Sequence, residues 1–489
     1  MALTKVTGGL LGNLPTGTNN VAVGDTALDS IESGGTGNVA IGSAAGTALT
    51  VGDESVAVGF EALMTATTGA ENVGVGYRAL KLTTGNSNVA VGKNALATNS
   101  SASNNTAVGT NALTANTTGV NNNAIGSSAG AANTTGNYNN VLGESALLAN
   151  TTGDSNVAIG GSALRANTTA DKNTGIGESA LRTNTTGAQN VAVGSNAMQF
   201  NTTADNNTAV GFEALKDNTT GTINTALGRQ ALANNTTGTD NTAVSYSLVT
   251  NTTGSNNTAV GVSALNANTT GTSNTGVGKS SGSGLTTGIE NTLVGRLAGY
   301  TLTTGNQNTV IGYHAETFAS NTAGSIVIGR NVTGVSSGSD DYIFTFGVND
   351  GSDRVYNEFD ANASWTRVSD ERYKEEIQDN TDCGLAFIND LRPVTFKWRP
   401  KSSVPETFPD YDSKKTTRRK NEKMYGLIAQ EVKAALDANN ITDFGGWNQI
   451  ENSVQTISQE MFIHPLIKAV QELSTQLDAA LARIETLEG

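Results

Sequence analysis

Hydrophobic and polar positions repeat about every seventeen residues through the first two thirds of the chain. The consensus is N-T-A-V-G-x-x-A-L-x-x-N-T-T-G-x-x: a short alternating stretch ends at a glycine, an apolar pair follows, and a polar run closes the repeat. The glycine position occurs nineteen times, in steps of 16, 17 or 18 residues, and serine replaces glycine once. Its members are Gly24, Gly42, Gly59, Gly76, Gly92, Gly109, Gly126, Gly143, Gly160, Gly177, Gly194, Gly211, Gly228, Ser245, Gly261, Gly278, Gly295, Gly312 and Gly329. Repeats this short cannot bury an apolar face alone, so we expect them to stack as a solenoid.

Each repeat predicts one short strand and one turn. The alternating stretch before the glycine, as in Asn207–Gly211, is typical of a strand. The Asn-Thr-Thr-Gly/Ala run predicts a turn, because Asn and Gly tolerate left-handed backbone. Its asparagines are expected to hydrogen-bond to one another up and down the stack. They are Asn116, Asn133, Asn150, Asn167, Asn184, Asn201, Asn218, Asn235, Asn251 and Asn268. These runs also match the glycosylation sequon, but their turn positions favour a structural role.

The predicted coil is thin. Seventeen extended residues span about 55 Å of contour, which fits inward side chains that are Ala, Val, Ile and Leu and rarely aromatic. Val or Ile lies on one face of the strand and Ala on the other, so both faces are apolar. We therefore expect one face to fill the coil and the other to pack against sister chains. Tyr246, beside the lapse at Ser245, marks either a binding feature or a tolerated defect of the repeat.

Charge divides the chain near Val368. Residues up to Val368 contain 14 Lys and Arg and 23 Asp and Glu, whereas the shorter remainder contains 15 and 20. The formal net charge of −14 would repel polyanions, which argues against a broad nucleic-acid interface.

Candidate metal and cofactor chemistry is sparse. One cysteine, Cys383, excludes an intrachain disulfide, and two histidines make a His-based metal site improbable, so we predict no metal and no cofactor. No stretch approaches eighteen apolar residues, so no membrane insertion is expected. The first residues, MALTKVTGGLLG, lack the pattern of a signal peptide, and we expect assembly in a cytoplasm.

The repeat pattern, as in Asn38–Ala45, resembles the head repeats of trimeric autotransporter adhesins and the shafts of some phage tail fibres. This resemblance covers roughly residues 20–330. It implies a parallel β-roll, left-handed, with three chains side by side.

The repeat ends in a short junction, residues 331–368. Tyr342–Phe346 and Val355–Phe359 predict two strands, and Asn349-Asp350-Gly351 predicts the turn between them. Trp365 follows. These aromatic residues either form a carbohydrate-binding platform or plug the end of a trimeric rod, and the plug is the simpler interpretation.

The C-terminal part carries four motifs in order. They are Ser369-Asp370-Glu371-Arg372-Tyr373-Lys374, Leu391-Arg392-Pro393-Val394, Phe396-Lys397-Trp398 and Tyr425–Val432. Together they resemble the intramolecular chaperone domain of endosialidases and other phage tailspikes, the peptidase S74 family. The resemblance implies a domain that trimerises the nascent fibre, helps the shaft to fold and then cuts itself off between Val368 and Ser369.

The resemblance also implies a catalytic dyad of Ser369 and Lys374, with Asp370 and Arg372 in support. A serine hydroxyl needs a base, and lysine can act as one when burial or a nearby cation lowers its pKa. On a straight helix, five residues separate the two side chains by about 140°, so either the motif is irregular or Lys374 reaches across the trimer. Read without the family, Ser369 and Asp370 would instead cap a helix.

The chain ends in a predicted coiled coil, residues 463–488. Apolar residues alternate there by three and four. They are Ile463, Leu466, Val470, Leu473, Leu477, Ala480, Ile484 and Leu487. The residue types alone lean towards dimers, whereas the resemblance implies trimers.

The predicted fold is mainly β: a trimeric β-solenoid shaft (21–330) after an N-terminal attachment segment (1–20), a β junction (331–368) and an α+β chaperone domain (369–489). We expect a homotrimeric tail fibre in the virion, assembled in the host cytoplasm. Its partners would be a host-cell surface receptor, such as a glycan, and other tail proteins. The expected enzyme activity is a single self-cleavage with no external substrate.

Two alternatives stay open: a bacterial trimeric surface adhesin and a tailspike with glycan-depolymerase activity. The second would need paired carboxylates. Four glutamates recur near one repeat position, namely Glu61, Glu144, Glu178 and Glu213. A solvated surface explains them more simply than an acid/base pair.

Overall fold

The computed structural model describes residues 19–32, 34–335, 343–349, 354–358, 362–367, 371, 374–375, 377–406, 411, 413–414, 416, 423–449 and 455–488. The chain divides into two compact units, Met1–Ser369 and Asp370–Gly489. The first contains the repeats and is called the shaft here; the second is called the C-terminal domain.

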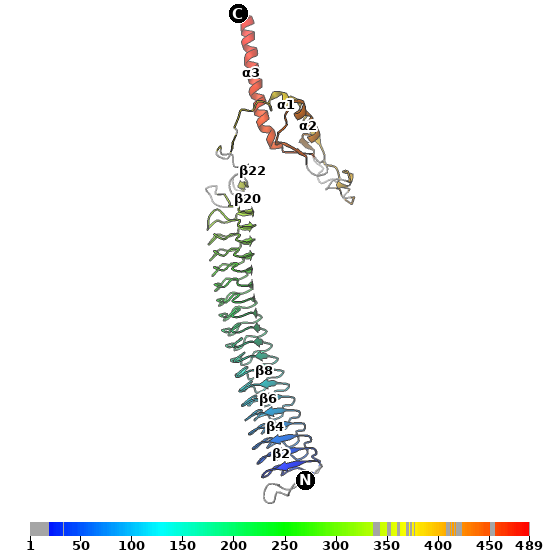
Figure 1. Ribbon diagram of the computed structural model, residues 1–489, viewed down its shortest axis with the longest axis vertical. Coiled ribbons are helices and arrows are strands. Elements are labelled where there is room, and N and C mark those ends of the chain that lie inside the picture. Colours follow the sequence, from blue (N-terminus) through cyan, green and yellow to red (C-terminus); the bar gives the residue numbers. More distant parts are fainter. Residues whose placement is uncertain are drawn as a thin grey trace, which may run out of the picture. The chain divides into compact units, whose positions relative to one another are not determined.

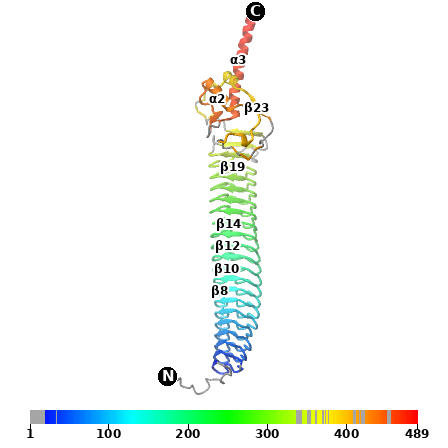
Figure 2. The ribbon, with the colours of Figure 1, turned by 90° about the vertical axis from the view of Figure 1, so that its right-hand side faces the viewer.

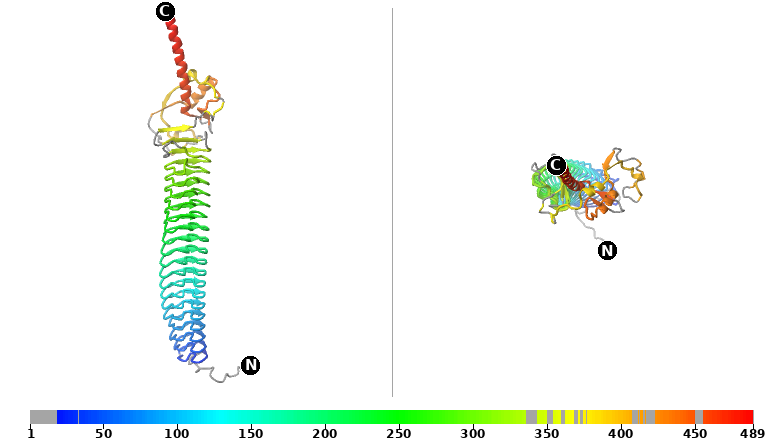
Figure 3. Two further views of the ribbon diagram at one scale, coloured as in Figure 1. Left: turned by 90° about the vertical axis from the view of Figure 1, so that its left-hand side faces the viewer. Right: turned by 90° about the horizontal axis from the view of Figure 1, so that it is seen from above.

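The shaft is a β-solenoid in which each repeat forms one coil (Figures 1 and 2). Its strands are β1 (Val21–Val23), β2 (Val39–Ile41), β3 (Val56–Val58), β4 (Val73–Val75), β5 (Val89–Val91), β6 (Thr106–Val108), β7 (Asn123–Ile125), β8 (Asn140–Leu142), β9 (Val157–Ile159), β10 (Thr174–Ile176), β11 (Val191–Val193), β12 (Thr208–Val210), β13 (Thr225–Leu227), β14 (Thr242–Val244), β15 (Thr258–Val260), β16 (Thr275–Val277), β17 (Thr292–Val294), β18 (Thr309–Ile311) and β19 (Ile326–Gly329). Each strand pairs in parallel with the next, as Val191 does with Thr208 and Val193 with Val210. The predicted solenoid is therefore confirmed, and Figure 3 shows its regular stack.

The recurring glycine is required by the close stacking of coils. These glycines have φ between +123° and +146°, a region that L side chains rarely adopt. At Gly109, a Cβ would lie 2.4 Å from the carbonyl oxygen of Gly126 in the next coil. Ser245 occupies this position once, at a different φ of 76°.

Alanine and leucine fill the inside of the coil. The alanine in the middle of a strand is buried, as are the alanine and leucine of the pair after the glycine; Ala158, Ala163 and Leu164 are each 0% exposed. The residue before the glycine points outward instead. Nine such residues are 36% to 49% exposed: Ile41, Val91, Ile125, Leu142, Ile159, Leu227, Val260, Ile311 and Ile328. The prediction that Val and Ile are among the inward side chains is thus wrong at this position, because period-two alternation puts both flanks of the central alanine on the outer face.

Two columns of buried asparagine run through the shaft. The turn asparagines bond to one another as predicted: Asn133 Nδ2 donates to Asn116 Oδ1 at 2.9 Å and to the Gly136 carbonyl at 2.9 Å. Because these amides are fully buried in the stack, the sequon-like runs act as structural turns. At the end of this column, where Leu285 takes the next place, Asn268 Oδ1 has no hydrogen-bond partner among the described residues.

The second asparagine column was not predicted. It consists of the asparagine that precedes each strand, from Asn38 to Asn308, with serine in place at Ser55. Asn122 Oδ1 accepts from the backbone N–H of Asn139 at 3.0 Å, and Asn122 Nδ2 donates to the Gly136 carbonyl at 2.8 Å. Each amide therefore joins neighbouring coils and also fastens strand to turn.

The junction adds three strands to the last coil. β20 (Ile343–Gly347) continues the parallel stack on β19, and β21 (Arg354–Glu358) returns antiparallel to β20. The predicted hairpin is confirmed. A third strand, β22 (Asn362–Arg367), pairs with β21 and contains Trp365, which was not predicted as strand.

The C-terminal domain mixes short helices and two-stranded hairpins. Its elements are α1 (Leu385–Asp390), β23 (Val394–Phe396), the 3₁₀ helix η2 (Lys401–Ser403), β24 (Met424–Gly426), α2 (Ala429–Ala438), β25 (Trp447–Gln449), β26 (Gln455–Ile457), the 3₁₀ helix η4 (Gln459–Phe462) and α3 (Ile463–Glu488). β23 pairs antiparallel with β24, and β25 with β26. The second half of α3 projects beyond the rest of the domain (Figure 1).

Candidate functional site

The first motif of the C-terminal domain is only partly described. Val368, Ser369, Asp370 and Arg372 lie outside the described residues. Lys374 is described: its backbone N–H donates to the Glu371 carbonyl at 2.9 Å, and its side chain is exposed. The predicted dyad therefore remains a prediction.

The second and fourth motifs meet in space. Arg392, just before β23, donates from Nε to Glu431 Oε2 at 3.0 Å and from Nη2 to Glu431 Oε1, a two-pronged ion pair. The hydrogen bond from Arg392 lowers the pKa of the Glu431 carboxyl. Both side chains are exposed, so the pair contributes little to stability but fixes how α2 approaches β23.

A small aromatic core holds the domain together. Phe387 of α1 is fully buried and packs edge-on against Phe444, with 5.6 Å between ring centroids. Phe462 stacks on Phe387 at 6.2 Å. Val432 and Leu436 of α2 complete this core. Phe444 and Phe462 were not singled out from the sequence, because neither belongs to one of the four motifs.

Helix α3 is fastened to α1 at its N-terminal half. Glu472 Oε2 accepts from the backbone N–H of Leu385 at 2.7 Å, at the start of α1. Ala469 of α3 is buried on this side.

The predicted heptad residues of α3 lie on a different side and form what is called the seam here. They are helical, and seven of the eight are 48% to 79% exposed: Ile463, Leu466, Val470, Leu473, Leu477, Ile484 and Leu487. The eighth, Ala480, is exposed too. Over the described residues of the single chain, the seam is a row of apolar side chains exposed to water.

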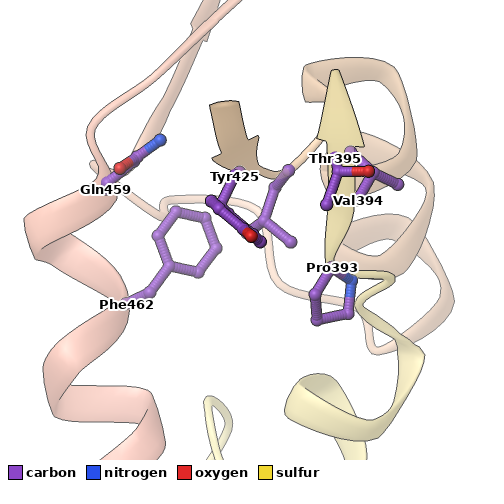
Figure 4. Close-up of a pocket in the computed structure, with 8 residues that line it drawn as sticks. Pro393, Val394, Thr395, Tyr425, Gln459 and Phe462 are labelled. Carbon is purple, nitrogen blue, oxygen red and sulfur yellow. The ribbon is translucent and has the colours of Figure 1, made fainter. Parts of the chain in front are cut away.

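An open cavity of about 460 Å³ lies beside the start of the seam (Figure 4). The hairpin β23–β24 supplies one wall, including Val394 and Tyr425, and η4 supplies Gln459 and Phe462. Figure 4 shows Tyr425 and Phe462 among the side chains that line this cavity. The polar side chains of the lining are those of Thr395, Tyr425 and Gln459, and the remaining lining residues are apolar or glycine.

Two of the recurring glutamates, Glu61 and Glu213, form ion pairs with nearby cations rather than with each other. Glu61 is held by Arg78 and Lys81, each at 2.8 Å, and Glu213 by Lys216 at 3.3 Å. The hydrogen bond from Lys81 lowers the pKa of the Glu61 carboxyl, so this group stays ionised. Glu61 and Glu213 are thus held in ion pairs with cations of their own surroundings, which gives no support to a depolymerase site built from these two.

Among the described residues, no group of three His, Cys, Asp or Glu side chains could hold a metal ion. None of their helices is long and apolar enough to cross a membrane. Burial raises the pKa of the Cys383 thiol.

Comparison with known proteins identifies the C-terminal domain. Residues 369–441 match the family model described as chaperone of endosialidase. Neither the comparison with curated proteins nor the comparison with solved structures found a match. The matched segment contains all four motifs, including the Arg392–Glu431 pair. The chain therefore carries an endosialidase-type chaperone domain at its C-terminal end, behind a long β-solenoid that fits the architecture of a tail fibre or tailspike.

Proposed function

We propose that the chain is the subunit of a homotrimeric tail fibre that attaches to a host-cell surface receptor and to other tail proteins of the virion. In this proposal, the C-terminal domain brings three chains together, guides folding of the shaft and then cuts the chain before Ser369. The observation that carries the proposal is the seam of α3, a row of exposed apolar side chains in a domain of the chaperone family.

The seam supports assembly through its energetics. Burying each Leu, Ile or Val side chain contributes roughly 1.5 to 3 kcal/mol, and the seam offers eight apolar positions in a heptad pattern. Facing seams from other chains satisfy this pattern without any change in the domain.

The outer face of the shaft supports the same assembly. The residue before each glycine forms a column of half-exposed Val, Ile and Leu side chains along the shaft. A patch this long and apolar is rare on a monomer and is typical of an interaction surface.

The uniform shaft explains why a chaperone is needed. Neighbouring coils present nearly the same alanine, leucine and asparagine positions, so a chain could pair one coil out of step at little enthalpic cost. Parallel, non-local strand pairing is also slow to nucleate. A domain that fixes three chains at one end supplies both the register and the nucleus.

The proposed cleavage uses the Ser369 hydroxyl as the nucleophile. Its Oγ would attack the Val368 carbonyl carbon while Lys374 accepts the hydroxyl proton and then gives it to the departing nitrogen of Ser369, so that the Val368–Ser369 amide becomes an ester and a free amine. Water would then hydrolyse the ester, which leaves a Val368 carboxylate. Because five residues would separate the two side chains by about 140° on a straight helix, we place the serine partner of Lys374 on a neighbouring chain, so that cleavage waits for assembly.

Expression of wild type beside Ser369→Ala tests the cleavage. Wild type is expected to give one fragment that ends at Val368 and another that spans 369–489, whereas Ser369→Ala stays whole on denaturing gels and by mass spectrometry. Lys374→Ala should also stay whole, and Ser403→Ala and Lys397→Ala are the matched controls. An uncut wild type would remove the proteolytic role.

Coexpression distinguishes cleavage within a chain from cleavage across the trimer. Differently tagged Ser369→Ala and Lys374→Ala chains each lack one half of the dyad. If the dyad forms between chains, the Lys374→Ala chain regains cleavage in mixed trimers. If both chains stay whole although mixed trimers form, the dyad lies within one chain.

A further inference from the structure

The residue directly after each glycine forms an exposed column along the shaft. Backbone hydrogen bonds fix this stacking: the carbonyls of Tyr246, Lys279 and Arg296 accept from the next coil at 2.6, 3.0 and 2.9 Å. Over the last eight coils, from β12 to β19 (green to yellow in Figure 2), the residues of this column are cationic or aromatic, with one valine. It is called the stripe here and consists of Phe212, Arg229, Tyr246, Val262, Lys279, Arg296, Tyr313 and Arg330.

The stripe concentrates positive charge. Residues 211–330 contain five Lys and Arg and five Asp and Glu, and four of the five cations lie in the stripe while none of the carboxylates does. None of the ion pairs among the described residues involves these four cations. In the seven coils before it, the same column is nearly neutral: Lys93, Thr110, Ser127, Glu144, Gly161, Glu178 and Ser195.

Aromatic rings are interspersed among the cations. Phe212, Tyr246 and Tyr313 are 45%, 36% and 43% exposed. Arg296 is held beside one ring: its Nη1 donates to Tyr313 Oη at 3.2 Å, and its guanidinium carbon lies 5.3 Å from the ring centroid. Ring and cation are thus presented together on the outside of the shaft.

The stripe is long and straight enough for an extended polymer. Seven steps between coils, at about 4.8 Å each, give a length of roughly 34 Å. Guanidinium groups bind carboxylate and sulfate oxygens through paired hydrogen bonds. Aromatic faces pack against the C–H face of a sugar ring, which favours a glycan over other polyanions.

The stripe is also unsuited to the interface between chains. A three-fold interface would gather the same four cations from each chain and remove them from water. Desolvating unpaired charges is costly. The Val and Ile residues that precede each glycine can be buried in an interface without this cost. The stripe therefore belongs on the outside of the trimer.

We infer that the stripe binds a linear anionic polysaccharide that lies along the shaft, with acidic groups on Arg229, Lys279, Arg296 and Arg330 and sugar rings on Tyr246 and Tyr313. This inference rests on the proposed attachment to a host-cell surface and assigns it a surface and a receptor class.

Binding of defined polymers by the purified full chain tests the inference. The probes are alginate and dextran sulfate, with neutral dextran, polyglutamate and single-stranded DNA as comparisons. Wild type should bind at least one acidic glycan more tightly than the other polymers, and salt should weaken binding. Replacing the four stripe cations by serine should weaken binding at least tenfold. The matched control replaces four exposed cations elsewhere, Lys93, Arg165, Lys172 and Arg182, and should change it less than twofold.

The tyrosines separate a glycan site from a simple basic patch. Tyr246→Ser with Tyr313→Ser should weaken glycan binding severalfold and leave polyglutamate binding unchanged. The inference is overturned if wild type binds neither acidic glycan, if polyglutamate or DNA binds as tightly, or if the control variant loses as much affinity. Loss of the trimer in the stripe variant would place the stripe in the interface and overturn it too. Mass and self-cleavage, measured on the same samples, report on the proposed function separately.

Discussion

The shaft and the C-terminal domain differ in how they bury apolar side chains and pair polar groups. In the shaft, the backbone and the buried asparagine amides form hydrogen bonds from each coil to the next. Alanine and leucine fill the inside, and two asparagine columns lie between strand and turn. Every coil therefore presents nearly the same partners, and little in the shaft distinguishes one register from the next. The C-terminal domain has a small core around Phe387 and leaves the apolar residues of the seam exposed in the single chain. The repeats thus form regular internal contacts, whereas in the proposed function the non-repetitive sequence after them directs assembly.

The largest predicted effect is the loss of trimer affinity on substituting a seam residue, which tests assembly without changing the core of the domain. Ala480→Asp puts a charge in the seam of every chain, and we expect the dissociation constant of the trimer to rise at least a thousandfold, or about 4 kcal/mol. Sedimentation equilibrium measures it. Ala479→Asp is the matched control, because Ala479 is exposed on the adjacent helix position outside the seam. Equal effects of the two variants would show that the seam is not an interface.

The next effect tests how tightly coils stack. Gly160→Ala adds a Cβ 2.6 Å from the Gly177 carbonyl at a φ of +123°, and we expect a loss of about 3 kcal/mol in unfolding free energy. Gly161→Ala meets nothing within 4 Å and should be nearly neutral. Guanidinium unfolding of both variants measures the contrast. A neutral Gly160→Ala would contradict the stacking geometry.

A smaller effect tests the asparagine column. Asn235→Ala removes its bonds to Asn218 and Gly238 and also removes the acceptor of one of the two hydrogen bonds that Asn251 Nδ2 donates, at 2.8 Å to Asn235 Oδ1. We expect a loss of about 2 kcal/mol. Asn234→Ala, at the exposed neighbouring residue, should cost less than about 0.5 kcal/mol. Similar unfolding midpoints for the two variants would mean that the column adds nothing to stability.

The smallest effect concerns the C-terminal domain. The pKa of Glu431 is lowered by Arg392 in the folded state, so the pair contributes stability above the unfolded pKa of glutamate and loses it as pH falls through the folded pKa. Glu431→Gln should remove this slight acid sensitivity from the thermal unfolding of the domain, and Glu460→Gln should not. An unchanged pH profile would show that the pair only orients α2.

The sequence predicts the coil well because the same pattern of residues recurs in every repeat. The glycine spacing and the Asn-Thr-Thr turns suffice for the parallel stack and one hydrogen-bonded column. The second column, as at Asn122, escaped prediction because an asparagine before a strand is also typical of an exposed turn. Leu113 has a left-handed φ of 47°, which no propensity of leucine indicates; tertiary packing imposes it.

The candidate site is less predictable for a different reason. The motifs identified the family and the heptads identified α3, but Arg392 and Glu431 are 39 residues apart, and Phe444 and Phe462 pack on Phe387 only after the chain has folded. The role of Ser369 and Lys374 depends on a neighbouring chain in the proposed mechanism, which no pattern within one chain can specify.

The most direct test is the mass of the intact fibre subunit in solution. The full-length Ser369→Ala chain, analysed by light scattering after size exclusion, should have three times the chain mass of 50.0 kDa. A well-folded, monodisperse species with the mass of one chain would contradict the assembly of three chains through the seam and the shaft.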